Sequence, residues 1–333
     1  WKARFIGTDG YIVTGTSVQY NLDDGSMVAY HNNEDKVYNC GNCHTTGWRH
    51  YDAIDNDNRQ DGLDGMDGTF FVGGVSCEAC HGGGSDHVAA PSRTNITRFA
   101  QPREAADFMH GRMGYALPVA CGECHTRDGQ ADYPSFVSPY NQARMAAGLD
   151  TVAMGGRIAG SSGLIKHHEQ YDEAIGVDPD TLLTTRSQNF LDAHGDCLTC
   201  HNSHGSAVYQ DDGDYTGPPA VRTDNGWCLT CHPNNDPQDR TGGMKGLTCI
   251  DCHMPKMSKS ALNHTLDNGV VIGDVTSHIW TIDVSKAGDE QFTDDLKFAY
   301  PYLTVDHACR TCHGNDGLFD VSASDTYVFH NNK

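Results

Sequence analysis

The sequence predicts mostly irregular coil with short α-helices and an N-terminal β-hairpin. Two observations lead to this fold class. Hydrophobic residues make up only 38% of the 333-residue chain, which also contains 37 glycines, so side chains alone supply little apolar core. All 14 cysteines lie in seven repeats of Cys-x-x-Cys-His between residues 40 and 313. We therefore expect the chain to wrap around groups that these repeats hold.

The Cys-x-x-Cys-His repeat is the attachment motif of c-type haem: two thiols bond the porphyrin and the histidine becomes the proximal iron ligand. A disulfide scaffold would not place a histidine after every second cysteine, and zinc sites that pair two Cys-x-x-Cys units would leave one of seven over. The sequence predicts seven haem c groups and hence storage or transfer of electrons. The attaching residues are Cys40, Cys43, Cys77, Cys80, Cys121, Cys124, Cys197, Cys200, Cys228, Cys231, Cys249, Cys252, Cys309 and Cys312, and the proximal ligands are His44, His81, His125, His201, His232, His253 and His313.

The chain offers about 48 residues for each haem, far fewer than the roughly 100–150 of a typical domain. The haems must therefore share one envelope, and we expect a continuous chain of seven c-type haems wrapped by coil. Their spacing is uneven, because three motifs lie between Cys40 and His125 and four between Cys197 and His313. We predict an N-terminal lobe, 1–190, with haems 1–3 and a C-terminal lobe, 191–333, with haems 4–7, without a hard boundary.

Local signals for regular structure are few. Strand-forming residues at Tyr11–Tyr20 and Ser26–Tyr30 flank an Asp-Gly turn, a pattern typical of a β-hairpin. Helices are predicted over 140–147 and 181–193. The second has apolar residues at helical spacing and would deliver His194 at its end. A core-facing helix with an incidental histidine is the alternative.

Twelve of the 19 histidines lie outside the motifs, although seven haems need at most seven distal ligands. This surplus predicts that most haems have two histidine ligands, whereas methionine, the alternative, would raise the potential. One of His167 and His168 is expected to ligate while the other donates a hydrogen bond. His264 ranks with His31 and His330 as a less favoured candidate, and His50 ranks below them. The favoured distal candidates are His87, His110, His168, His194, His204, His278 and His307, followed by His31 and His330.

Short tethers limit which haem some of these histidines can reach. His204 follows His201 by three residues, His307 precedes Cys309 by two, and His194 precedes Cys197 by three. A histidine so close to a motif cannot fold back over the haem of that motif. We expect each of them to ligate a neighbouring haem.

The acidic, glycine-rich stretch 52–68 is the candidate for a second cofactor. Its side chains Asp55, Asp57 and Asp61 could offer oxygen ligands to calcium. Arg59 stands where a ligand would be needed. A solvated loop is therefore favoured over a calcium site.

The formal charge of −21 approaches about −28 if each oxidised haem adds roughly one negative charge. This excess argues against nucleic acid and anionic membrane surfaces as partners and favours cationic partners, metal ions or a saline medium, or serves solubility alone. No apolar run approaches 18 residues, so no membrane span is expected. Because c-type haem is attached outside the cytoplasmic membrane, we expect a removed signal peptide and a periplasmic or extracellular location.

Several segments resemble known multihaem cytochromes. Cys-Gly-Asn-Cys-His-Thr-Thr-Gly-Trp and Gly-Val-Ser-Cys-Glu-Ala-Cys-His-Gly-Gly-Gly-Ser-Asp-His, within residues 38–88, resemble the tetrahaem cytochrome that serves hydroxylamine oxidoreductase. Cys-Leu-Thr-Cys-His-Asn-Ser-His-Gly is similar to the doubled motif of periplasmic electron carriers. Cys-Ile-Asp-Cys-His-Met-Pro-Lys and Gly-Asp-Val-Thr-Ser-His are similar to segments of pentahaem nitrite reductases and octahaem tetrathionate reductases. The resemblance spans roughly half of the chain, is specific for haem architecture rather than activity, and implies that His87, His204 and His278 are distal ligands.

The resemblance also sets the functional expectation. The nitrite reductases carry lysine instead of the motif histidine at the catalytic haem, whereas all seven motifs here end in histidine. Electron transfer is therefore favoured, and reduction or oxidation of a nitrogen or sulfur compound is an alternative.

In haem density and ligand surplus the chain resembles extracellular cytochrome filaments, in which a histidine of one subunit completes a haem of the next. Such a head-to-tail contact does not close and makes a polymer. We expect a conductive filament for electron export, joined through His330 or His31, with redox proteins or extracellular acceptors as partners. A soluble periplasmic carrier is the alternative.

Overall fold

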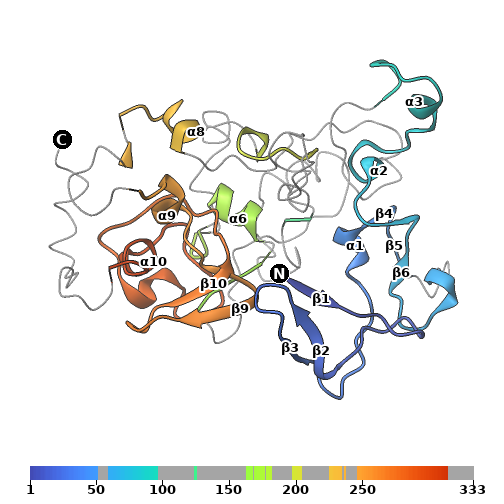
Figure 1. Ribbon diagram of the computed structural model, residues 1–333, viewed down its shortest axis with the longest axis horizontal. Helices are drawn as coiled ribbons and strands as arrows, with labels where there is room; N and C mark the ends of the chain where they lie inside the picture. The colour runs from blue at the N-terminus through green and yellow to red at the C-terminus, as the bar shows by residue number, and fades with distance from the viewer. Residues whose placement is uncertain are drawn as a thin grey trace. The chain divides into compact units, whose positions relative to one another are not determined.

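The computed structural model describes residues 1–51, 59–96, 124–125, 163–167, 169–176, 178–181, 197–204, 225–234, 236–237 and 246–313. Most of this backbone is irregular, with short helices and strands, in agreement with the predicted fold class (Figure 1). Two compact units are distinguished: Trp1–Cys124 with Ser260–Leu262, and His125–Lys259 with Asn263–Lys333. The predicted lobes meet near residue 190, outside the described residues, so that division stays a prediction. The predicted helices over 140–147 and 181–193 also lie outside them, apart from Thr181, which belongs to a turn.

The first unit opens with the predicted hairpin. Strands β1 (Lys2–Arg4), β2 (Gly15–Asn21) and β3 (Met27–Tyr30) form an antiparallel sheet in the order β1-β2-β3. In the turn, the Asn21 N–H donates to the Ser26 carbonyl at 2.9 Å, and Gly25 adopts a left-handed φ of 67° that favours glycine. Strand β2, the first strand of the predicted hairpin, begins at Gly15 rather than Tyr11, because Ile12 instead bridges to Ile6 and Lys36.

Two short ribbons join the first motif to the second. After α1 (Gly41–His44), strand β4 (Thr45–Thr46) pairs with β7 (Val72–Gly73), and β5 (Arg49–His50) pairs with β6 (Gly68–Thr69). The 3-10 helix η1 (Gln60–Gly62) lies between them in sequence, and α2 (Cys77–His81) and α3 (Ser85–Ala89) follow. The indole of Trp48 lies so close to Gly41 that a Cβ there would meet it at 2.1 Å. Glycine is thus required at this position inside the first motif.

The second unit contains a three-stranded sheet of order β10-β9-β8. Strand β8 (Ile165–Lys166) runs parallel to β9 (Ser258–Thr265), and β10 (Val271–Val275) is antiparallel to β9. The helices of this unit are short: α6 (Gln170–Ile175), η4 (Cys197–Thr199), α8 (Asn225–Leu229), α9 (Cys249–His253), η6 (Gly288–Gln291) and α10 (Val305–Ala308). In the described part of the chain, no helix has the length and apolar character needed to cross a membrane.

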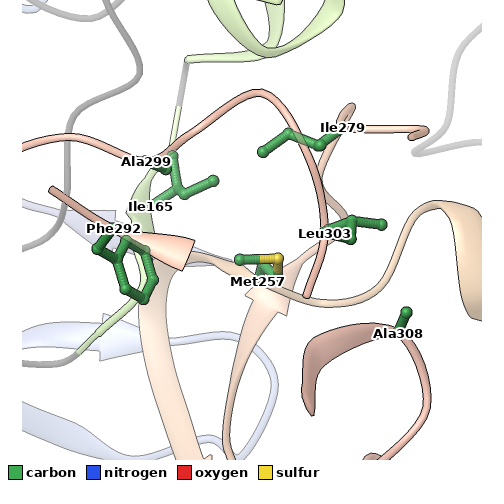
Figure 2. Close-up of a cluster of buried hydrophobic side chains, with 7 residues drawn as sticks. All are labelled: Ile165, Met257, Ile279, Phe292, Ala299, Leu303 and Ala308. Carbon is green, nitrogen blue, oxygen red and sulfur yellow. The ribbon is translucent and has the colours of Figure 1, made fainter. Parts of the chain in front are cut away.

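A small apolar core holds the second unit together (Figure 2). Next to it, the buried Gln291 amide donates to the Tyr302 carbonyl at 2.6 Å and accepts the Thr304 N–H at 2.9 Å, which satisfies its polar atoms without water. The core consists of Ile165, Met257, Ile279, Phe292, Ala299, Leu303 and Ala308.

The extended segment that leaves β10, residues 275–280, is here called the strap. Its side chains alternate: Val275, Ser277 and Ile279 are buried, whereas His278 and Trp280 are partly exposed. This is the period of two of an extended chain with one face on a core. Ile279 inserts into the cluster of Figure 2, and His278 and Trp280 share the opposite face.

Leu303 is fully buried in this core, so Leu303→Ala should lower the free energy of unfolding by about 2–5 kcal/mol through lost transfer energy and a residual cavity. The measurement is urea unfolding followed by near-ultraviolet circular dichroism. Leu296→Ala is the control, because Leu296 is 54% exposed and its loss should change stability by less than about 0.5 kcal/mol. Equal effects of the two substitutions would contradict the assignment of this core.

Candidate haem-binding sites

Each motif described in full forms about one helical turn. In the first, the N–H of His44 donates to the carbonyl of Cys40 at 3.0 Å; the same bond joins His201 to Cys197 at 2.8 Å. It recurs between His313 and Cys309 at 2.9 Å. Residues i, i+3 and i+4 of a helical turn share one face, so both thiols and the imidazole face the same way. This is the arrangement that attaches one porphyrin and provides its axial nitrogen.

The described cysteines do not fit a zinc site. Among described residues, no group of three or more His, Cys, Asp or Glu side chains is placed to hold a metal ion. Burial raises the pKa of Cys309 to about 11, and burial together with the neighbouring Cys228 raises the pKa of Cys249 to about 11. The donor set of these turns fits covalent haem attachment.

Motifs five, six and seven lie next to one another. The side chain of Asn225, at the start of α8, accepts the Cys249 N–H at 2.8 Å and donates to the Leu247 carbonyl at 3.1 Å. The Asn268 amide donates to the Arg310 carbonyl at 2.7 Å, which ties the β9–β10 turn to the seventh motif. Helix α9 contacts α10, and Cys252 is close enough to raise the pKa of Cys309. The turns are thus joined by side chains outside the motifs.

Two proximal histidines have ring nitrogens oriented by neighbours. Nδ1 of His253 lies 2.8 Å from the Trp280 carbonyl oxygen, and Nδ1 of His125 lies 3.3 Å from Oε1 of Gln170. A hydrogen bond to one ring nitrogen fixes the tautomer and leaves the other nitrogen for a metal. Both residues fit the role of an iron ligand held through Nε2.

Two histidines, His201 and His125, lie near His278 of the strap. The rings of His201 and His278 have centroids 6.0 Å apart and planes 24° apart. Metal–imidazole bonds of about 2 Å would place the centroids of two ligands on opposite sides of one metal at about 6 Å. The pKa of His278 is lowered to about 3, mainly by burial and then by the neighbouring His201 and His125. His201 and His278 therefore fit the two axial positions of one haem.

Three other predicted distal ligands are described. His87, in α3, has Nδ1 3.1 Å from both the Ser92 carbonyl oxygen and Asn95 Oδ1. His307, in α10, packs edge-on against Phe292, and burial lowers its pKa to about 4. His204 is exposed in the turn after the fourth motif. Which haem each of them serves stays a prediction.

His31 is exposed, with a left-handed φ of 39° and Nδ1 3.1 Å from the Glu34 carboxylate. His264 is exposed in β9, and His167, one of the pair His167 and His168, has Nδ1 3.2 Å from the Lys259 carbonyl oxygen. Cys121, His110, His168, His194 and His330 lie outside the described residues.

The candidate calcium loop is described only in part, because Asp55 and Asp57 fall outside it. The guanidinium of Arg59 stacks 3.8 Å above the Tyr51 ring and donates to the Met66 carbonyl at 3.2 Å. Arg59 therefore stabilises the loop itself, and calcium binding stays a prediction.

Sequence reasoning missed three residues that contact the motifs or their candidate ligands: Asn225, Glu173 and Trp280. Asn225 joins two motifs, Trp280 orients His253, and the Glu173 carboxylate accepts the backbone N–H of His278 at 2.5 Å. No sequence pattern around Asn225 or Trp280 distinguishes either residue. Glu173 is buried, which the polar sequence around it does not indicate.

Comparison with known proteins gives a match to a family described as "Cytochrome c554 and c-prime" over residues 16–82. The match covers about a fifth of the chain and includes the first two motifs. No protein of curated function matches.

Three solved structures are similar at low identity. The undecahaem cytochrome from the S-layer of Carboxydothermus ferrireducens is 15% identical, with a TM-score of 0.42, covering 97% of this chain and 50% of that one. The Wolinella succinogenes octahaem sulfite reductase MccA is 16% identical, with a TM-score of 0.44, covering 86% and 43%. The outer cell wall cytochrome OcwA is 17% identical, with a TM-score of 0.42, covering 91% and 68%. This chain spans about half the length of the first two. Together with the motif turns, the family match supports the interpretation of the chain as a multihaem c-type cytochrome.

Proposed function

We propose that this protein transfers electrons through seven covalently attached haems, most of them with two histidine ligands. The observation that carries the proposal is the joining of consecutive motif turns by side chains, as Asn225 joins the fifth motif to the sixth. Motifs in direct contact hold their porphyrins close together. Short spacing between redox centres is what electron transfer along a chain requires.

The axial ligands are the finer part of the proposal. His201 and His278 complete one haem, supported by the 6.0 Å separation and near-parallel planes of their rings. His204 and His307 each ligate a haem other than that of the adjacent motif, because their tethers are short. Paired imidazoles hold haem iron at low potential and leave no position for a substrate.

Removing one cysteine pair tests the nature and number of the cofactors. The double variant Cys249→Ala, Cys252→Ala should contain six haems instead of seven, measured by intact mass and the alkaline pyridine spectrum. In the unsubstituted protein, thioether bonds should leave no thiol for an alkylating reagent after unfolding. Thiols that react, together with zinc released to a chelator, would contradict covalent haem.

Substitution of His278 tests the axial pair. His278→Ala should convert one haem from six-coordinate low-spin to five-coordinate high-spin, seen by electron paramagnetic resonance and near-infrared spectra. Thr281→Ala, at an exposed position just beyond the strap, is the control and should leave all haems low-spin. A low-spin spectrum unchanged by His278→Ala would remove His278 from the ligand set. A high-spin haem in the unsubstituted protein, with turnover of nitrite or hydroxylamine, would favour an enzyme instead.

The location and assembly are also proposed: an extracellular protein that polymerises head to tail, with His31 or His330 completing a haem of the next subunit. His31 supports this because it is exposed and its Nδ1 is engaged by Glu34, which leaves Nε2 for iron. Redox proteins or extracellular acceptors would then be the partners. A charge near −28 opposes self-association at low ionic strength, where screening is weak.

Negative-stain microscopy of the native protein at low and high salt tests the polymer. Filaments should form with salt, and either His31→Ala or His330→Ala should abolish them, while His264→Ala, another exposed histidine, should not. Monodisperse monomers at high salt, with all haems six-coordinate, would instead indicate a soluble periplasmic carrier.

A further inference from the structure

A buried carboxylate lies beside the strap. Glu173, in α6, is 4% exposed. Its Oε1 accepts a hydrogen bond from the Ser258 hydroxyl at 3.1 Å, and its Oε2 accepts the backbone N–H of His278 at 2.5 Å. A buried carboxylate is costly unless hydrogen bonds compensate it. The two donors come from β9 and the strap, so this carboxylate links α6 to both.

The same carboxylate faces the ring of His278. Oε2 of Glu173 lies 3.8 Å from Nδ1 of His278, beyond hydrogen-bond length. In the described structure, this buried Nδ1 has no hydrogen-bond partner. The backbone N–H and the ring Nδ1 of His278 thus both face Oε2 of Glu173. A modest rotation of the ring would bring Nδ1 within hydrogen-bond reach of it.

We infer that Glu173 is a positioning residue for His278: it anchors the strap through the backbone N–H and accepts the Nδ1 proton, which leaves Nε2 as the iron ligand. This rests on the proposed function, in which His278 is the distal ligand of the haem at Cys197–His201. Histidines that bind metals commonly donate their second ring N–H to a carboxylate or carbonyl, which fixes the ring and raises its basicity.

A carboxylate and a carbonyl differ as hydrogen-bond acceptors for a ligand histidine: α6 provides the carboxylate, and the strap provides the carbonyl. Nδ1 of His253 has the neutral Trp280 carbonyl at 2.8 Å, whereas His278 faces the Glu173 carboxylate. The charged acceptor makes its histidine the stronger donor to iron, which stabilises the ferric state. The haem of the fourth motif should therefore have a lower potential than that of the sixth.

The test is Glu173→Gln, which keeps the shape of the side chain and removes its charge. Spectroelectrochemical titration should show the midpoint potential of one haem shifted upward and the other six unchanged. The electron paramagnetic resonance signal of the same haem in its ferric state should also change. Glu173→Asp, which keeps the charge, should recover part of the shift. Thr281→Ala is the control: its side chain is exposed just beyond the strap and makes no hydrogen bond to Glu173 that is described, so it should change neither potential nor resonance.

Glu173→Gln with seven haems, unchanged potentials and unchanged resonances would overturn the inference. If this variant does not assemble, Glu173→Asp carries the test: a displaced potential of one haem supports positioning by Glu173, and wild-type potentials contradict it. His278→Ala, measured in parallel, separates the two hypotheses. If it leaves every haem low-spin, the axial pair itself fails; if it gives one high-spin haem while Glu173→Gln has no effect, only the role of Glu173 fails.

Discussion

The hydrogen bond from a motif histidine to the carbonyl of the first cysteine, seen at His44, His201, His232 and His313, is the interaction on which the rest of this structure depends. It closes one helical turn and thereby brings two thiols and an imidazole to a single face. Helices of four or five residues are not stable alone, because nucleation costs more than one turn returns. Several other described elements hold such turns in place. The ribbons β4–β7 and β5–β6 do so in the first unit, and Asn225 and Asn268 do so in the second.

The sequence predicted the parts of the fold that are local. The motif turns follow from five consecutive residues, and the β2–β3 hairpin from an Asp-Gly turn between strand-forming residues. The start of β2 at Gly15 was not predicted, because Ile12 pairs outside the hairpin, with Ile6 and Lys36. Strands of two residues, such as β4 and β8, have no pattern long enough to detect; their partners determine them.

In the candidate site, too, the sequence predicted what is local and missed what depends on contacts between distant residues. His278 could be selected from its surrounding residues, and His307 from its short tether to Cys309. Their environments could not be predicted, because they arise from contacts between residues far apart in the chain. Glu173 reaches the strap across 105 residues of sequence, and Ser258 reaches Glu173 across 85. Seven motifs of one pattern also make the sequence uninformative about which histidine faces which haem, since any of several distal histidines satisfies the same chemistry.

Buried and partly exposed side chains alternate along the strap, so the number of its residues is as important for the structure as their identity. Insertion or deletion of one residue within 275–280 would exchange the two faces, turning the imidazole toward Leu303 and Met257 and the isoleucine toward the porphyrin. A polar ring would then replace an apolar side chain in the core, while the proposed haem would lose its second axial nitrogen. A substitution of Ile279 alone would disturb only the packing of the core, and a substitution of His278 alone would disturb only the proposed haem ligation. Changes in length across this segment should therefore be far less tolerated than changes of residue type, even where the new residues are chemically similar.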